Sequence, residues 1–140
     1  MAQRIAACLV IFLAVLTAWS APGQAQPKDK IKIVNIVPDS LILGDKRREV
    51  TVEIEYELET KKEGIIYLGF NTDKPEQYVI TESVRVKKGK GRVTLKSKVK
   101  AVDWQGLAPF YAYANISEYP HPSPWKALDF VTAEIKIKRR

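Results

Sequence analysis

The chain has 140 residues and a formal net charge of +7, and it contains one cysteine and one histidine. A single cysteine excludes an intramolecular disulfide, and this composition excludes zinc sites built from several histidines and cysteines. The length predicts one ordinary domain.

The first 25 residues have the layout of a signal peptide. Arg4 precedes an apolar run over residues 5–18, and a small-x-small pattern ends at Ala25. The run is shorter than the roughly 20 apolar residues that a transmembrane helix needs. We therefore expect export to the periplasm or the outside of the cell, cleavage near Ala25 and a mature domain over residues 26–140. An uncleaved N-terminal anchor is the alternative.

The rest of the chain shows strand patterns and no helix of normal length. Stretches rich in β-branched and aromatic residues alternate with Gly, Pro, Asn and Asp, which favour turns. The predicted strands cover residues 31–37, 50–59, 65–70, 77–87, 92–100, 110–116 and 127–137.

Local patterns refine this prediction. Residues 50–59 alternate apolar and acidic side chains, as a strand with one buried face does, and residues 65–70 are apolar on both faces, as in a central strand. Glu82 interrupts the apolar pattern of its strand and predicts a bulge or a sheet edge. The glycines of residues 88–91 predict a tight β-hairpin turn between the two strands on either side.

About seven short strands in one domain are typical of a two-sheet antiparallel sandwich of the immunoglobulin-like class. The stretch 107–113, with Leu107, Pro109 and Tyr113, resembles the E–F corner of fibronectin type III domains. That resemblance implies a sandwich with Tyr113 as its corner tyrosine, of the kind found in bacterial adhesion-type surface domains. Such a fold hosts many functions and predicts none by itself.

Motifs for catalysis, cofactors or metals do not occur in the sequence. His121 has no second histidine or cysteine to complete a metal site, and we interpret it as an exposed loop imidazole. Nucleophile and phosphate-binding motifs do not occur either. We therefore predict a protein without catalytic activity, cofactor or metal.

A proline-rich loop is the first candidate binding site. Its alternating prolines keep it extended, and an aromatic side chain stands at each end, which suits a sugar face or an extended peptide. We predict that it binds a protein or carbohydrate partner through Tyr119, Pro120, His121, Pro122 and Trp125. An alternative stays open, in which Trp125 folds back and closes the end of the core.

A basic segment is the second candidate, because residues 85–100 contain eight basic and no acidic side chains. Part of this charge is expected to pair across the sheet with the acidic stripe Glu53, Glu55, Glu57 and Glu59. The remainder, on a basic hairpin, predicts binding to anionic polymers or lipid headgroups. The residues assigned to that site are Arg85, Lys87, Lys88, Lys90 and Arg92.

Lysines on an edge hairpin also protect a sheet against aggregation, which is a further interpretation of this segment. A third function is that of a structural subunit of an envelope assembly, with an exposed edge strand as its interface through strand addition. We expect no nucleic-acid partner, because the hairpin lacks aromatic platforms on which bases stack.

Overall fold

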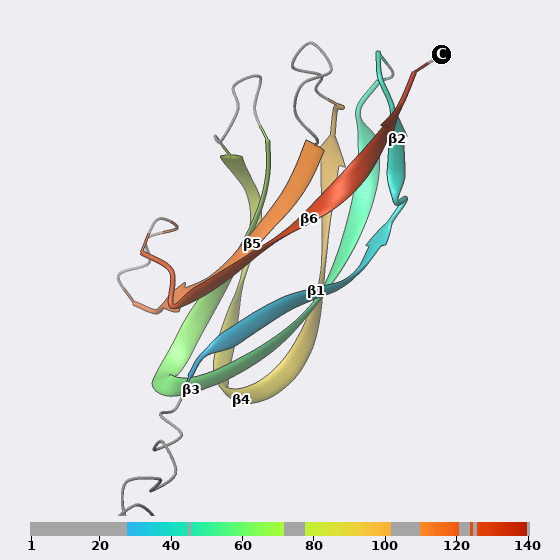
Figure 1. The fold of residues 1–140 in the computed structure, drawn as a ribbon. Coiled ribbons are helices and arrows are strands. Elements are labelled where there is room, and N and C mark those ends of the chain that lie inside the picture. Colours follow the sequence, from blue (N-terminus) through green and yellow to red (C-terminus); the bar gives the residue numbers. More distant parts are fainter. Residues whose placement is uncertain are drawn as a thin grey trace, which may run out of the picture.

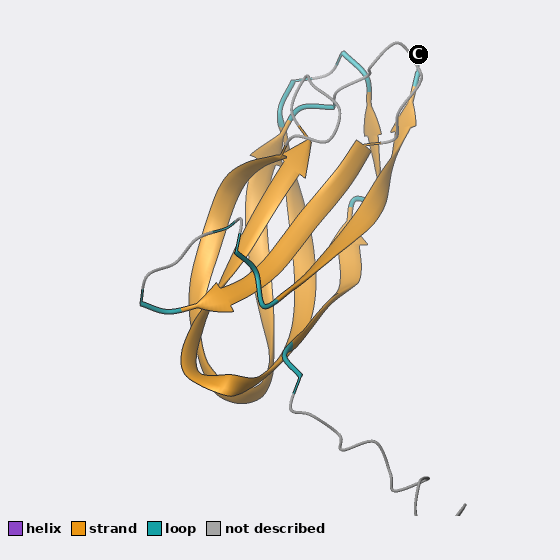
Figure 2. Ribbon diagram, turned by 60° about the vertical axis from the view of Figure 1, so that its left-hand side comes forward, coloured by secondary structure: helices purple, strands orange, loops and turns teal. Residues whose placement is uncertain are grey.

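The structure, a computed structural model, describes residues 28–44, 46–71, 78–101, 110–120, 124 and 126–139. The described residues form strands and loops and contain no helix (Figures 1 and 2), so the predicted all-β class is confirmed. Among them, no helix is available to span a membrane. The strands are β1 (Lys30–Val37), β2 (Ser40–Ile42), β3 (Arg48–Asn71), β4 (Tyr78–Val99), β5 (Phe110–Glu118) and β6 (Asp129–Lys138).

The strands join in the order β1-β3-β5-β6-β2, and β4 pairs with β3 outside this path. All pairings are antiparallel except that of β2 with β6. β1 pairs with β3, and β2, which follows β1 directly in the sequence, pairs with β6 at the other end of the strand order. The sheet therefore nearly closes on itself (Figure 2). A hydrogen bond from the Ile31 amide to Asp129 Oδ2, 2.9 Å long, also links β1 to the start of β6.

β3 and β4 are long strands that bend together. Between the pairs Leu58–Gly89 and Glu63–Lys87, residues 59–62 of β3 face the single residue Lys88 of β4. The first half of β3 pairs with β1 and the second half of β4, while its second half pairs with β5 and the first half of β4. The bend is visible where the two ribbons curve round at the bottom of Figure 1.

Two sequence predictions are wrong at this bend. The predicted strands 50–59 and 65–70 are one strand, and residues 88–91 do not close a hairpin, because the backbones of both halves of β4 pair with β3 and not with each other. Gly89 does have a positive φ of 123°. The conformation of Gly89 bends β4 without reversing its direction, because β3 bends at the same place and stays paired with β4 on both sides of it.

Asp29 holds the bend in β3 from outside the strand. Its Oδ1 accepts hydrogen bonds from the amides of Glu59 and Thr60 at 2.7 and 3.0 Å, and its Oδ2 accepts one from the Thr60 hydroxyl. Burial alone raises the pKa of Asp29, but these bonds outweigh it and hold the pKa below its usual value. The carboxylate therefore supplies acceptors to backbone amides that the bend removes from the β3–β4 ladder.

The core lies between the two halves of the bent strands. Val50, Val52 and Ile54 are fully buried and Glu53 and Glu55 are half-buried, so the predicted alternation of residues 50–59 is confirmed. The second half of β3 is central, with Ile66 and Leu68 fully buried between β4 and β5. In β6, Val131, Ala133, Ile135 and Ile137 form the inner row, as predicted.

A bulge interrupts β4 where Glu82 predicted one. The register shifts between Leu68–Glu82 and Gly69–Ile80, which leaves Thr81 as the extra residue. The bulge brings backbone against Gly69, where an added Cβ would lie 2.8 Å from the carbonyl oxygen of Val79. A glycine is required here because any side chain would push β4 away.

Gly69→Ala is expected to lower the free energy of unfolding by about 1–3 kcal/mol, because backbone must move to admit the methyl group. Gly91→Ala is the matched variant. Its methyl group would meet the hydroxyl end of the Tyr56 ring, which is half-buried and able to move. Urea unfolding of both variants checks the prediction, and an equal loss in the two would contradict it.

The Asp29 carboxylate also predicts a pH dependence of stability. A pKa below its unfolded value contributes stability above the unfolded pKa, and this contribution is lost as the pH falls through the folded pKa. Asp29→Asn should cost about 1 kcal/mol at neutral pH, after allowance for its partial exposure, and the difference from wild type should shrink below about pH 4.

Urea unfolding at neutral and acidic pH measures that difference. Asp39→Asn provides the control, because Asp39 is exposed in the turn between β1 and β2. A difference between Asp29→Asn and wild type that stays constant with pH would rule out the proposed role of the carboxylate charge.

Candidate functional site

An aromatic row crosses the outer face of the sheet that β4, β5 and β6 share with the second half of β3. The rings of Tyr78 on β4 and Tyr113 on β5 stack with centroids 4.8 Å apart, and those of Tyr113 and Phe130 on β6 stack at 6.1 Å. Phe130 is 64% exposed. We call the surface formed by Tyr78, Tyr113 and Phe130 the aromatic face.

Register explains how rings from strands that are not neighbours meet. Tyr113 lies opposite Gly69 of β3, which stands between β4 and β5 and has no side chain. Strands two places apart in a sheet are separated by roughly 10 Å, too far for stacked rings unless the space above the middle strand is empty. Gly69 adds no side chain between the two tyrosines, and the atoms nearest to its missing Cβ are those of Val79 and Ile80 of β4.

Tyr67 extends the same face along β3. It lies two residues before Gly69 and opposite Asn115, so its side chain points outward beside the aromatic row. Burial raises the pKa of the Tyr67 phenol above its ordinary value. The face thus combines flat apolar rings with hydroxyl groups.

A buried polar chain runs along the outward side of β5. The Ser117 hydroxyl donates to Asn115 Oδ1 at 3.1 Å, and Asn115 Nδ2 donates to the Tyr113 hydroxyl at 3.1 Å and to the Pro124 carbonyl at 2.7 Å. Asn115 is fully buried. Since Pro124 belongs to the loop between β5 and β6, Asn115 anchors that loop on the sheet.

The loop that the sequence singled out borders this face. Of its predicted binding residues, Tyr119 is half-buried and Pro120 is exposed, whereas His121, Pro122 and Trp125 lie outside the described residues. The Tyr119 amide donates to the Glu63 carbonyl at 3.3 Å, next to the bend in β3. The choice between a presented and a core-closing Trp125 stays open.

Arg85 links the two predicted sites. Its guanidinium carbon lies 3.9 Å above the centroid of the Tyr119 ring, and its Nη2 lies 3.3 Å from Glu63 Oε2. A stacked guanidinium fixes the ring of Tyr119 at the start of the loop. The residues of the loop and of the basic segment, predicted as separate sites, therefore meet at the bend.

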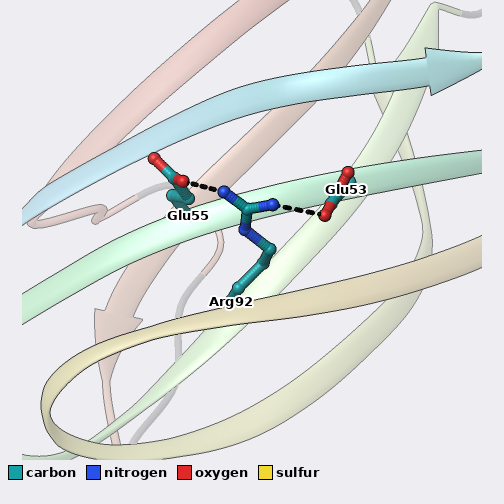
Figure 3. Close-up of polar contacts among 3 residues, drawn as sticks. All are labelled: Glu53, Glu55 and Arg92. Carbon is teal, nitrogen blue, oxygen red and sulfur yellow. Dashed lines mark hydrogen bonds and ion pairs between the residues drawn. The ribbon is translucent and has the colours of Figure 1, made fainter.

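The expected pairing of the acidic stripe with Arg92, Lys96, Lys98 and Lys100 is present only in part, because Arg92 alone of these four makes ion pairs with the described residues. Arg92 donates to Glu53 Oε1 at 2.8 Å and to Glu55 Oε1 (Figure 3), and these bonds raise the pKa of its guanidinium. Lys90 Nζ lies 3.7 Å from Glu57 Oε1. The expectation that Lys90 lies beyond the reach of the acidic stripe is wrong, because β4 lies beside β3 through the bend and not on a hairpin that projects from it. Arg85 pairs with Glu63, which lies outside that stripe.

A groove of about 540 Å³ follows the charged side of β1, β3 and β4. Within it, a hydrogen bond between Glu57 and Glu59 lowers the pKa of Glu57 and raises that of Glu59. Most of its charged groups have partners, so the groove does not present a single charge to a ligand. It is lined by Lys30, Ile31, Lys32, Glu55, Tyr56, Glu57, Lys90, Gly91 and Arg92.

The described residues contain no cluster of three or more His, Cys, Asp or Glu side chains that would hold a metal ion. The aromatic face was not predicted from the sequence. Phe130 is the residue from which part of this face could have been predicted, because it is a large aromatic residue on the outward row of an alternating strand. Tyr78 and Tyr113 join it only through a register that no local pattern reveals.

Removal of the loop anchor is expected to release the loop. Asn115→Ala leaves a buried carbonyl and two buried hydroxyl groups with fewer partners, which should cost about 1–3 kcal/mol of stability. Trypsin should also cleave faster after the exposed Lys126. Ser117→Ala is the control, because it keeps the bond from Asn115 to Pro124. Equal cleavage rates in Asn115→Ala and Ser117→Ala would show that Asn115 does not anchor the loop.

No family model and no curated protein matches the sequence. Among solved structures, β-glucosidase from Listeria innocua bound to isofagomine is 13% identical with a TM-score of 0.43, over 79% of this chain and 16% of that one. The DNA glycosylase AlkC from Pseudomonas fluorescens is 9% identical with a TM-score of 0.42, over 78% of this chain and 30% of that one. The chain thus spans less than a third of either neighbour.

Proposed function

We propose that this protein is an exported, non-catalytic binding module that holds a carbohydrate partner on its aromatic face. The row of stacked rings of Tyr78, Tyr113 and Phe130 carries this proposal. Its position beside the 119–128 loop extends the binding site that the sequence predicted.

An immunoglobulin-like sandwich is the proposed arrangement of the strands. The shared bend supports it, because one group consists of β1 with the first half of β3 and the second half of β4. The other group consists of the remaining halves of β3 and β4 with β5 and β6. Counted by halves and without the short β2, the groups contain three and four strands, which supports a seven-stranded sandwich as the proposed arrangement.

The chemistry of the aromatic face favours a sugar. A pyranose ring presents a flat face of C–H groups, which stacks on an aromatic ring while the hydroxyl groups at its edge find polar partners. Tyr113 is buried and Tyr78 is half-buried, so these stacked rings hold Phe130 in an ordered row and leave the direct contacts to it. Phe130, at the end of the row, is exposed enough to contact such a ligand directly.

Export would bring the protein to the compartment that contains polysaccharide partners. The signal-peptide layout of residues 1–25 supports an extracytoplasmic location, where polysaccharides of the envelope occur. A domain exported without disulfides depends on its core and on bonds such as those of Asp29 and Asn115 for stability.

The electrostatic alternative has weaker support. Three of the five basic residues assigned to it, Arg85, Lys90 and Arg92, pair with glutamates of β3. Lys87 and Lys88 are exposed near the bend, but two lysines make a small site for an anionic polymer or a lipid surface.

Phe130→Ala tests the proposed function. Insoluble cellulose, chitin and peptidoglycan serve as probes, and we expect the protein to bind at least one of them with little dependence on salt. The substitution should weaken that binding about tenfold, which corresponds to about 1.4 kcal/mol, and leave the fold intact because the ring is mostly exposed.

Val37→Ala is the matched control, since Val37 is an exposed apolar residue, 55% accessible, on β1. It should bind like the wild type. Failure of the wild type to bind any probe, or an equal loss of binding in the two variants, would contradict the proposal. If Phe130 instead captures a protein ligand, the partner is a protein and not a carbohydrate.

A further inference from the structure

The outer edge of β4 is a long and regular strand edge. In the described part of the chain, β3 is the only strand that pairs with β4. From Gly89 to Val99 the pairing with β3 continues without a register shift. Proteins usually interrupt or cover such edges, because unpaired amide and carbonyl groups attract another strand.

Side chains along this half of β4 form two distinct rows. The outward row is exposed and basic, with Lys90, Arg92, Lys96 and Lys98 separated by Thr94. The inward row contains Val93, Leu95, Ser97 and Val99, of which the last three are buried. The Ser97 hydroxyl shares a 2.5 Å hydrogen bond with the Thr81 hydroxyl in the first half of β4. A strand added at this edge would meet cations on one face and the margin of the core on the other.

β3 shows what kind of strand fits beside these rows. It pairs with the same half of β4 on its other edge and alternates acidic with apolar residues, so that Glu53 and Glu55 bond Arg92 while Val52 and Ile54 enter the core. Cross-strand pairs of opposite charge are favourable, and the same rule applies on both edges of a strand.

We propose that the Gly89–Val99 edge of β4 accepts an extended segment of a different protein, in which acidic and apolar residues alternate. The segment would add to the sheet through backbone hydrogen bonds, with carboxylates toward the lysines and apolar side chains toward Val93 and Leu95. The inference does not depend on the aromatic face, which is formed by the first half of β4 and by other strands.

Charge selects this occupant over a second copy of the chain. Two β4 edges would bring the basic row of each copy, which includes Lys96 and Lys98, against the basic row of the other, and β1 offers Lys30 and Lys32 on its own exposed positions. The acidic strand β3 is central, with partners on both edges. Lys96 and Lys98 make no ion pair with any of the described residues, so they remain available to an acidic partner.

A designed peptide tests the proposal on the full chain. The probe is a ten-residue peptide in which glutamate alternates with valine, and binding is followed by titration and by the exchange protection of the β4 amides. We expect binding together with new protection between Gly89 and Val99. A peptide with the same composition in two blocks, and one with N-methylated backbone amides, should not bind, because neither can add as a paired strand.

Charge reversal provides the matched variants. Lys96→Glu with Lys98→Glu should weaken binding about tenfold, whereas Lys136→Glu with Lys138→Glu, the same change on exposed positions of β6, should leave it within about twofold. Thermal unfolding confirms that both variants fold. Absence of binding, equal binding of the block or N-methylated peptides, or equal losses in the two variants would overturn the proposal.

Discussion

The bend that β3 and β4 make together is the constraint on which the other features depend. At the bend, four residues of β3 stand opposite one residue of β4. The amides of Glu59 and Thr60 donate hydrogen bonds to Asp29 instead of to the neighbouring strand. Because both strands turn at the same place, each contributes to two differently composed surfaces. The first half of β3 carries the paired charges, and the second half lies between β4 and β5, whose residues Tyr78 and Tyr113 stack.

The charged surface and the aromatic surface differ in how many of their side chains already have partners within the protein. On the charged side, Arg92 already has two carboxylate partners and Lys90 has one, so little remains for a ligand apart from the outer lysines. On the aromatic side, Asn115 uses its polar atoms to hold the loop in place, which leaves Phe130 as an exposed apolar group beside an ordered backbone. An ordered, partly apolar surface loses little entropy when a partner binds, which is the physical basis for the assignment of the binding face.

The strand content could be predicted from the sequence because it is local. The alternation of residues 50–59, the inner row of β6 and the bulge near Glu82 all follow from side-chain patterns within one strand. The bend could not be predicted, since the glycines of residues 88–91 suit a hairpin equally well and only the long pairing with β3 decides between the two. The aromatic face was missed for the same reason: Tyr78, Tyr113 and Phe130 are far apart in the chain and meet through register.

Backbone NOEs of the folded protein test directly whether β3 and β4 bend together. The shared bend predicts interstrand backbone contacts between β3 and β4 on both of its sides, from Ile54 to Val93 and from Ile66 to Val84. A hairpin closed at residues 88–91 would instead give backbone contacts between Val86 and Val93 within β4. That second pattern would remove the bend, the open edge of β4 and the arrangement of the aromatic face together.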